Sequence, residues 1–186
     1  MHITHRPLGT SQRGAVLLVS LMILLIMTVL GIAGMSSTTM EEKMAANNQQ
    51  RQQAFQASET ALRDAEAWLT ANITQVDDLA LFNGSNGLYA LRRTATGLAP
   101  VETDFNLYDN GAWVSKGVAS ESLLDGQDTP RYIIEYMGDY GSGGPCLDPL
   151  NCSPVAKFAF RITAIGWSVD GTARYLAWSH YGRRLN

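Results

Sequence analysis

Residues Ala15–Met40 read AVLLVSLMILLIMTVLGIAGMSSTTM and contain no charged side chain. The first part, Ala15–Gly34, supplies roughly the ~20 apolar residues that a helix needs to cross the bilayer core. A helix is expected there because backbone polar groups in lipid must hydrogen-bond within the segment. Ser20 and Thr28 are the polar residues of this part, and each can bond to a backbone carbonyl one turn earlier. The stretch therefore predicts a membrane-spanning helix.

Two interpretations of this apolar stretch compete, a retained anchor and a cleaved secretory signal peptide. Signal peptides have an apolar region of ~7–15 residues followed by a small-residue cleavage site. Here the apolar run is longer, and helix-forming sequence without proline continues over Glu41–Leu69. We therefore favour a retained anchor.

The charges that flank the apolar stretch predict its orientation. Arg6 and Arg13 precede it in a leader without acidic residues, whereas Glu41, Glu42 and Lys43 follow it. The positive-inside bias then keeps the leader in the cytoplasm and exports the rest. The expected organisation is a leader peptide (1–14), a transmembrane helix (15–40) and an exported globular domain (41–186) that includes the second half of the helix.

The composition of the exported part limits its function. All 17 acidic residues follow the leader, and 12 of the 14 basic residues do, so residues 15–186 carry a net charge of −5. General nucleic-acid binding requires a net basic face and is not expected. At 186 residues, the chain has room for one domain beside the anchor.

The second half of the helix has an amphipathic pattern over Glu41–Leu69. We expect one stripe of this helix to face the core and to cover a sheet. The stripe consists of Phe55, Leu62, Trp68 and Leu69.

Strand patterns lie mainly in the last third of the chain. Arg131–Met137 is rich in β-forming residues, and Lys157–Trp167 alternates between apolar and polar residues. Asp170-Gly171 is a two-residue hairpin signal, after which Thr172–Tyr181 is expected to return as a strand. The predicted fold is α+β, with a long helix packed on an antiparallel sheet. Residues 70–130 contain many turn signals, and their short strands are expected at Leu88–Leu91 and Ala112–Val114.

The sequence contains few residues that could form a disulfide, a metal site or a catalytic site. The two cysteines, Cys146 and Cys152, favour a disulfide in an exported domain, with two free thiols as the alternative. His180 is the only histidine after the leader, so a metal site is not expected. Ser179 and His180 are adjacent on a predicted strand and would point to opposite faces, which disfavours a nucleophile–base pair. No phosphate loop, HExxH or GxSxG motif occurs, and we expect neither a cofactor nor an enzyme activity.

Several short motifs carry a family resemblance. Gln12-Arg13-Gly14 precedes the apolar helix, and Met44-Ala45, Ala54-Phe55-Gln56-Ala57 and Glu59-Thr60-Ala61-Leu62 follow it. Together with the run Phe160–Gly166, these motifs resemble the PilX-type minor pilins of type IV pili. The resemblance extends over residues 12–69 and, more weakly, over the last thirty residues.

This resemblance implies a pilin fold and a pilin's maturation. It implies cleavage after Gly14 by a membrane prepilin peptidase and N-methylation of Ala15. It also implies an inner-membrane protein with one span and a periplasmic domain, which is later extracted into a filament on the cell surface. The implied partners are other minor pilins, the major pilin, the inner-membrane assembly platform and a tip adhesin.

The sequence departs from the major-pilin pattern at one position. Major pilins have Glu at the fifth mature position, where it meets the charged N-terminus of a neighbour, and this chain has Val19 there. Our hypothesis is that the protein acts at the pilus tip or in the initiating complex, where one neighbour is absent. Two alternatives remain. They are a minor pseudopilin of type II secretion and a membrane-anchored periplasmic binding module or enzyme.

Overall fold

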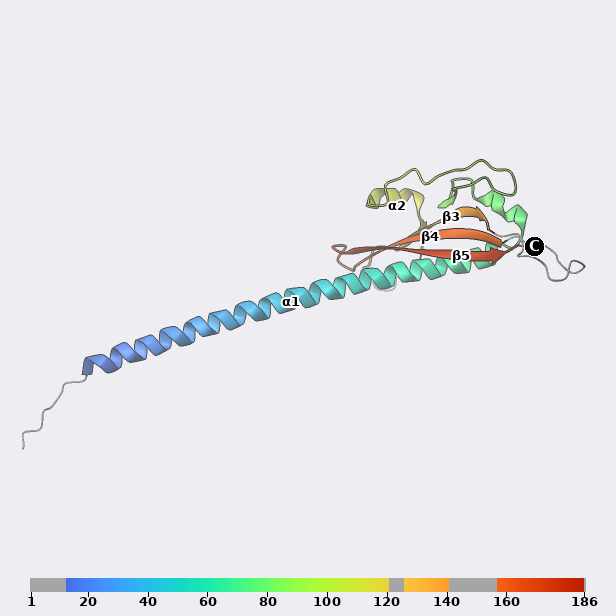
Figure 1. Ribbon diagram of the computed structural model, residues 1–186. Helices are drawn as coiled ribbons and strands as arrows, with labels where there is room; N and C mark the ends of the chain where they lie inside the picture. Colours follow the sequence, from blue (N-terminus) through green and yellow to red (C-terminus); the bar gives the residue numbers. More distant parts are fainter. Residues whose placement is uncertain (1–12, 121–125, 141–156, 186) are drawn as a thin grey trace, which may run out of the picture. The chain divides into compact units, whose positions relative to one another are not determined.

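The computed structural model describes residues 13–120, 126–140 and 157–185 (Figure 1). The chain divides into two compact units, residues 1–46 and residues 47–186. The elements are α1 (Arg13–Asn72), the 3-10 helix η1 (Val76–Leu81), β1 (Leu88–Ala90), α2 (Asn110–Lys116), β2 (Val118–Ala119), β3 (Arg131–Asp139), β4 (Lys157–Trp167) and β5 (Arg174–Arg184). The helix predicted over Ala15–Leu69 is confirmed as α1.

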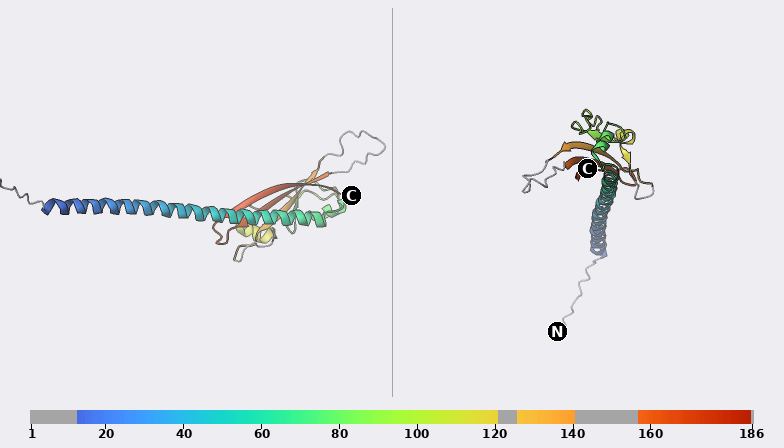
Figure 2. Two further views of the ribbon diagram at one scale, coloured as in Figure 1. Left: turned by 90° about the horizontal axis from the view of Figure 1, so that it is seen from below. Right: turned by 90° about the vertical axis from the view of Figure 1, so that its right-hand side faces the viewer.

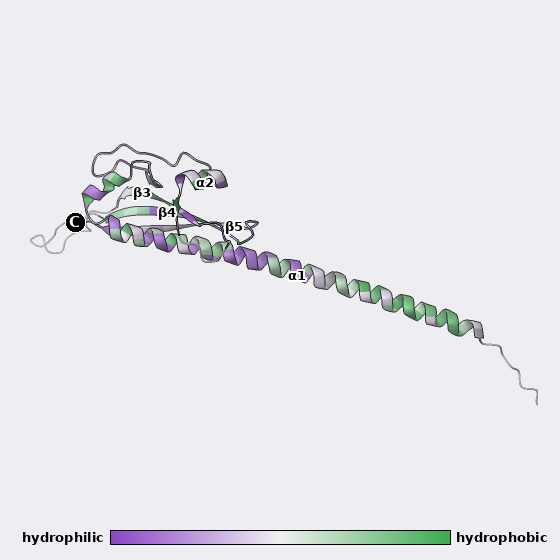
Figure 3. Cartoon of the chain, turned by 180° about the vertical axis from the view of Figure 1, so that it is seen from behind, coloured by the Kyte–Doolittle hydropathy of each residue, from purple (hydrophilic) through white to green (hydrophobic). Residues whose placement is uncertain are grey.

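The first unit contains the apolar part of α1. Figure 3 shows the change of character along this helix, which is hydrophobic in its first part and mixed further on. The change follows the sequence, because the first charged residues after the apolar stretch are Glu41, Glu42 and Lys43.

The second unit is built on a five-stranded sheet of strand order β1-β3-β4-β5, in which β2 also pairs with β3. The pairs β3–β4 and β4–β5 are antiparallel, as predicted, whereas β1 runs parallel to β3. In the register of the three long strands, Arg161 on β4 lies opposite both Glu135 on β3 and His180 on β5. The predicted α+β fold with a long helix on a sheet is confirmed.

The residues of α1 in the second unit cover one face of the sheet (Figure 2). The buried helix residues on this face are mostly small, and they are Ala54, Ala57, Ser58, Ala61, Leu62, Ala65 and Leu69. The backbone of β4 lies very close to them at Gly166. A Cβ atom at this position would lie 2.7 Å from the Ala57 Cβ and would also meet the Ala54 carbonyl and the Ser58 amide. The close packing therefore depends on residues without bulk on both elements.

Phe55, which was predicted to belong to the core-facing stripe of the helix, points away from the core. Leu62 and Leu69 are buried and Trp68 packs against the core, but the Phe55 side chain is 42% exposed. Ala54 and Ala57 take the positions that face β4, which turns Phe55 away from the core. Its ring instead makes an edge-to-face contact with Tyr175, at a centroid distance of 5.1 Å.

The opposite face of the sheet is covered by α2 and the chain that precedes it (Figure 2). Residues 112–114 belong to α2, so the strand predicted there is wrong. Asp109 begins the helix by accepting a hydrogen bond from the Gly111 amide at 2.9 Å, a typical N-cap interaction. Trp113 is fully buried and donates its indole N–H to the Leu107 carbonyl at 2.9 Å, which fixes α2 on the sheet.

The β4–β5 connection is longer than the predicted two-residue hairpin. The last strand pair is Trp167–Arg174, so the loop comprises residues 168–173, with Asp170-Gly171 at its centre. Gly171 has a φ of 69°, which accounts for the glycine there. The Asp170 carboxylate accepts hydrogen bonds from the Ser168 hydroxyl at 2.6 Å and from the Thr172 amide at 3.1 Å. These side-chain bonds stabilise a wider loop than the dipeptide alone predicts.

Three carboxylates of the second unit predict how its stability depends on pH. Backbone amides of Gln75 and Thr74 lower the pKa of Asp78, and hydrogen bonds from Lys116 and Ser168 lower those of Asp104 and Asp170, all below the ordinary 3.8. A carboxylate with a lowered pKa stabilises the fold above its unfolded pKa, and this contribution is lost as the pH falls through its folded pKa.

We therefore expect the unfolding midpoint in urea to be insensitive to these groups at pH 5–7 and to fall as the pH drops below about 4. The decline should be smaller for Asp170→Asn, because an amide side chain does not titrate. An unchanged acid dependence in both Asp170→Asn and Asp78→Asn would contradict this assignment.

Candidate assembly segment and surface pockets

The apolar part of α1 has no cover from any other described part of the chain. The large apolar side chains of residues 16–35 are each at least 52% exposed, and the most apolar part of the helix has no buried residue. Helix α1 is long and apolar enough to cross a membrane. A helix that is hydrophobic on all sides is stable only when lipid or other helices surround it.

The side chains of Ser20 and Thr28 within this segment bond to the helix itself. Ser20 donates to the Leu17 carbonyl at 2.9 Å, and Thr28 donates to the Leu25 carbonyl at 2.7 Å. These bonds confirm the prediction from the sequence. Because neither of these two hydroxyls needs a partner outside the helix, they are compatible with an apolar environment.

The residues expected to direct maturation lie at the start of α1. Gly14 and Ala15 belong to its first turns, and Val19 lies one turn further, with its side chain 53% exposed. The leader before Arg13 lies outside the described residues, as do Cys146 and Cys152, so the cleavage site and the disulfide remain predictions. No acidic residue occurs between Ala15 and Met40.

Strand β5 holds the end of α1 through polar contacts. Arg183 donates from its guanidinium to the carbonyls of Leu69 and Thr70, both at 2.7 Å. The last carbonyls of a helix lack partners within the helix, and a cation near them also interacts favourably with the helix dipole. The hydroxyls of Thr70 and Tyr181 add a contact at 3.1 Å.

Arg183→Met should therefore lower the free energy of unfolding by about 1.5–2 kcal/mol, because two charge-assisted hydrogen bonds to the end of α1 are lost. The adjacent Arg184→Met is the matched control, since its exposed side chain makes no hydrogen bond to any described residue, and it should change stability by less than about 0.5 kcal/mol. Urea unfolding of both variants measures the difference. Equal effects would show that Arg183 does not cap the helix.

A partly buried ion pair lies on the sheet face that is turned away from α1. The Glu135 carboxylate, whose residue is 3% exposed, accepts from the Arg161 Nε at 2.7 Å and from the Thr103 hydroxyl at 2.8 Å. The same contact to Glu135 raises the pKa of Arg161. A groove of about 530 Å³ lies over this pair, and Trp178, 65% exposed, forms part of its wall.

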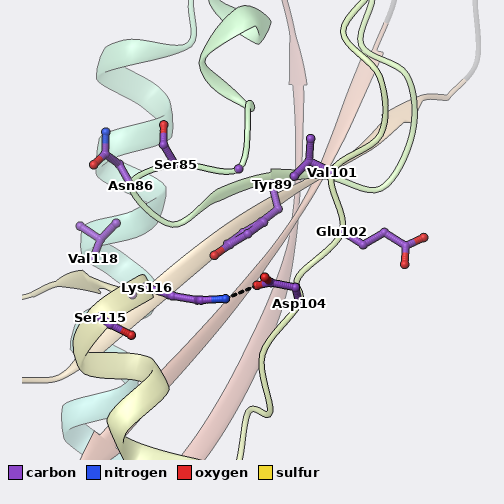
Figure 4. A pocket seen from close by; sticks show the side chains of 11 residues that line it. Ser85, Asn86, Tyr89, Val101, Glu102, Asp104, Ser115, Lys116 and Val118 are labelled. Atoms are coloured by element: carbon purple, nitrogen blue, oxygen red, sulfur yellow. Dashed lines mark hydrogen bonds and ion pairs between the residues drawn. The ribbon is translucent and has the colours of Figure 1, made fainter.

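A second pocket, which we call the Tyr89 pocket, has a volume of about 550 Å³ and lies between the 84–89 turn, residues 101–104 and the end of α2 (Figure 4). Tyr89 comes from β1, and Lys116 is the last residue of α2. Lys116 forms an ion pair with Asp104, and its ammonium lies 5.7 Å from the Phe105 ring centroid. No sequence pattern predicted this pocket, because three separate segments of residues 84–118 meet to form it.

The described residues show no arrangement typical of catalysis. No group of three or more His, Cys, Asp or Glu side chains able to hold a metal ion occurs among them. The prediction for Ser179 and His180 is confirmed. Ser179 donates to Glu66 on α1, whereas His180 lines the groove on the other face of the sheet.

Two protein-family models together match nearly the whole chain. The family model described as PilX N-terminal matches residues 13–63. The model described as Type IV pilus assembly protein PilX C-term matches residues 41–183. No curated protein sequence and no solved structure matches the chain.

Proposed function

Because this chain belongs to the PilX family of type IV pilus assembly proteins, we propose that it is a minor pilin that helps to initiate the pilus at or near its tip. The family consists of structural pilins involved in pilus assembly. The observation that carries the proposal is the apolar segment of α1, which is exposed on all sides and has Val19 where major pilins have an acid.

The exposed apolar segment allows the protein to exchange one apolar environment for another. In the inner membrane, lipid would surround residues 15–40, and residues 41–186 would lie in the periplasm. During assembly, the same surface would pack against the helices of other minor pilins and of the major pilin. Helix association gains little from the hydrophobic effect in lipid, so packing contacts drive it. Transfer into the filament would therefore need the assembly platform.

Maturation of the chain follows from the position of its leader. We propose that the prepilin peptidase cleaves after Gly14, that Ala15 is then N-methylated, and that the whole apolar segment stays on the mature protein. The first unit would then present a charged N-terminus at the end of an apolar helix.

The proposed tip position follows from Val19. In a bundle of low dielectric constant, an unpaired charge is costly, and the acid of a major pilin is expected to pair with the N-terminus of a neighbour. A subunit with Val19 cannot form this pair. The cost is smallest where the relevant neighbour is absent, as it is at the tip, where the chain would also contact a tip adhesin. A tip pseudopilin of type II secretion would share this feature, but the family match favours the pilus.

Deletion of the gene in its own bacterium tests the function. We expect fewer surface pili in the deletion strain, and restoration of their number by the wild-type gene. An epitope tag on the complementing protein should label filament ends in immunogold electron micrographs. Dense labelling along the whole filament would contradict the tip position, and a normal number of pili in the deletion strain would contradict the role in initiation.

A further inference from the structure

We propose that the Tyr89 pocket binds a neutral saccharide, which neither the family match nor the pilin role assigns. The assignment depends on the pocket alone and goes beyond the proposed function. Its volume of about 550 Å³ lies within the range of ligand pockets, ~300–1,000 Å³.

The first observation is a tyrosine hydroxyl that is open to the pocket. Tyr89 as a whole is 3% exposed, but its hydroxyl is not among the fully buried polar atoms, and it makes no hydrogen bond to any described residue. Burial raises the pKa of Tyr89, so the phenol keeps its proton at neutral pH. Figure 4 shows the hydroxyl directed into the pocket, towards Lys116. A ligand hydroxyl can therefore bond to this group in place of water.

The second observation is the number of hydrogen-bond acceptors in the pocket lining. The Ser85 hydroxyl donates to Asn83, and the Ser115 hydroxyl donates to backbone carbonyls of α2, so both oxygens present lone pairs. Glu102 and Asp104 add carboxylates to the lining. A site rich in acceptors requires a ligand rich in donors, and the hydroxyl groups of a sugar meet this requirement.

The charge balance of the pocket disfavours an anionic ligand. Lys116 is the one cationic side chain in the described lining, and its ammonium is already paired with Asp104. Glu102 forms no ion pair with any described residue, so the lining has a net negative charge. A phosphate or carboxylate would be repelled, whereas a neutral molecule would not.

The apolar side chains of the pocket lining also fit a saccharide. The lining also contains the Tyr89 ring and the aliphatic side chains of Val101 and Val118 (Figure 4). A pyranose ring has one face of C–H groups and an edge of hydroxyls. It can therefore pack its apolar face on these side chains while its edge donates to the acceptors.

Saturation-transfer NMR on the full-length chain tests the proposal, in a zwitterionic detergent that has no sugar headgroup. The probes are methyl glucoside, methyl galactoside and methyl N-acetylglucosaminide, compared with glucose 6-phosphate and glucosamine. We expect saturation of at least one neutral glycoside and weaker or no transfer to the phosphate. Stronger binding of the phosphate, binding of glucosamine alone or binding of no probe would each overturn the proposal.

Tyr89→Phe separates binding from folding, because it removes only the unpartnered hydroxyl. It should weaken glycoside binding about tenfold and leave the urea midpoint unchanged, since no described residue loses a hydrogen bond. The matched control is Tyr108→Phe, which removes the hydroxyl of an exposed tyrosine outside the pocket lining and should leave binding unchanged. Unchanged affinity in Tyr89→Phe, or equal losses in both variants, would show that the sugar does not occupy this pocket.

Discussion

Gly166→Ala is expected to lower the free energy of unfolding of the second unit by about 2–3 kcal/mol, near the upper end of the usual cost of overpacking. The added methyl group would meet the Ala54 carbonyl, the Ser58 amide and the Ala57 Cβ. Two of these contacts are helix backbone, which cannot rotate away as a side chain can. The helix would have to shift along its whole contact with the sheet, from Ala54 towards Leu69.

Gly182→Ala on β5 is the matched control for this prediction. Its new methyl group would meet the hydroxyl end of Tyr140, a half-exposed side chain that can swing aside. Both substitutions reduce the entropy of the unfolded chain equally, so the difference between them reports the helix–sheet contact. Tryptophan fluorescence during urea unfolding of the full-length protein in micelles measures both. Equal stabilities would show that α1 does not pack on β4 at Gly166.

Leu25→Arg is expected to have the second large effect, the loss of stable membrane insertion. The residue lies near the middle of the apolar segment, and an arginine at the centre of a membrane helix costs about 2.5–3.5 kcal/mol on insertion scales. The same charge would also oppose packing in a bundle of apolar helices. We expect the variant to appear in the soluble or degraded fraction and to fail to restore pili in a deletion strain.

Gln49→Arg provides the control for the inserted charge. It places the same side chain at an exposed position of α1, beyond the apolar segment. It should fractionate with membranes as the wild-type protein does. Membrane fractionation followed by immunoblotting distinguishes the two variants. Normal membrane association of Leu25→Arg would show that residues 15–40 do not form the anchor.

The elements with strong local patterns could be predicted from the sequence. Helix α1 has a long run of helix-forming residues without proline, and β3 and β4 are rich in β-forming residues. On β4, the alternation of Phe158, Phe160 and Ile162 with polar residues matches their burial against α1. Such patterns depend only on residues that are near one another in the chain, so the sequence alone was sufficient to predict these elements.

The errors arose where tertiary packing overrides a local pattern. Residues 112–114 have strand-forming character, but the Asp109 cap and the burial of Trp113 make them helical. Phe55 is the largest apolar residue of its helix turn, yet only small residues fit beside Gly166. In the last loop, the bonds made by Asp170 extend a turn that the dipeptide alone would close sooner.

The candidate sites also divide into one that a local pattern predicts and others that depend on tertiary packing. Composition alone predicted that residues 15–40 are long and apolar enough to cross a membrane, because length and hydropathy are properties of the segment itself. The Tyr89 pocket and the Arg183 cap could not be identified from the sequence. Their residues come together only through the parallel β1–β3 pair and the end of β5.

The mass of the mature N-terminal peptide from native protein tests the central claim most directly. The protein would be purified from its own bacterium, from both membranes and sheared pili, and analysed by mass spectrometry. The account predicts a chain that begins at N-methylated Ala15 and retains the apolar segment. A chain that begins at Met1, or one cleaved after the apolar segment, would contradict it.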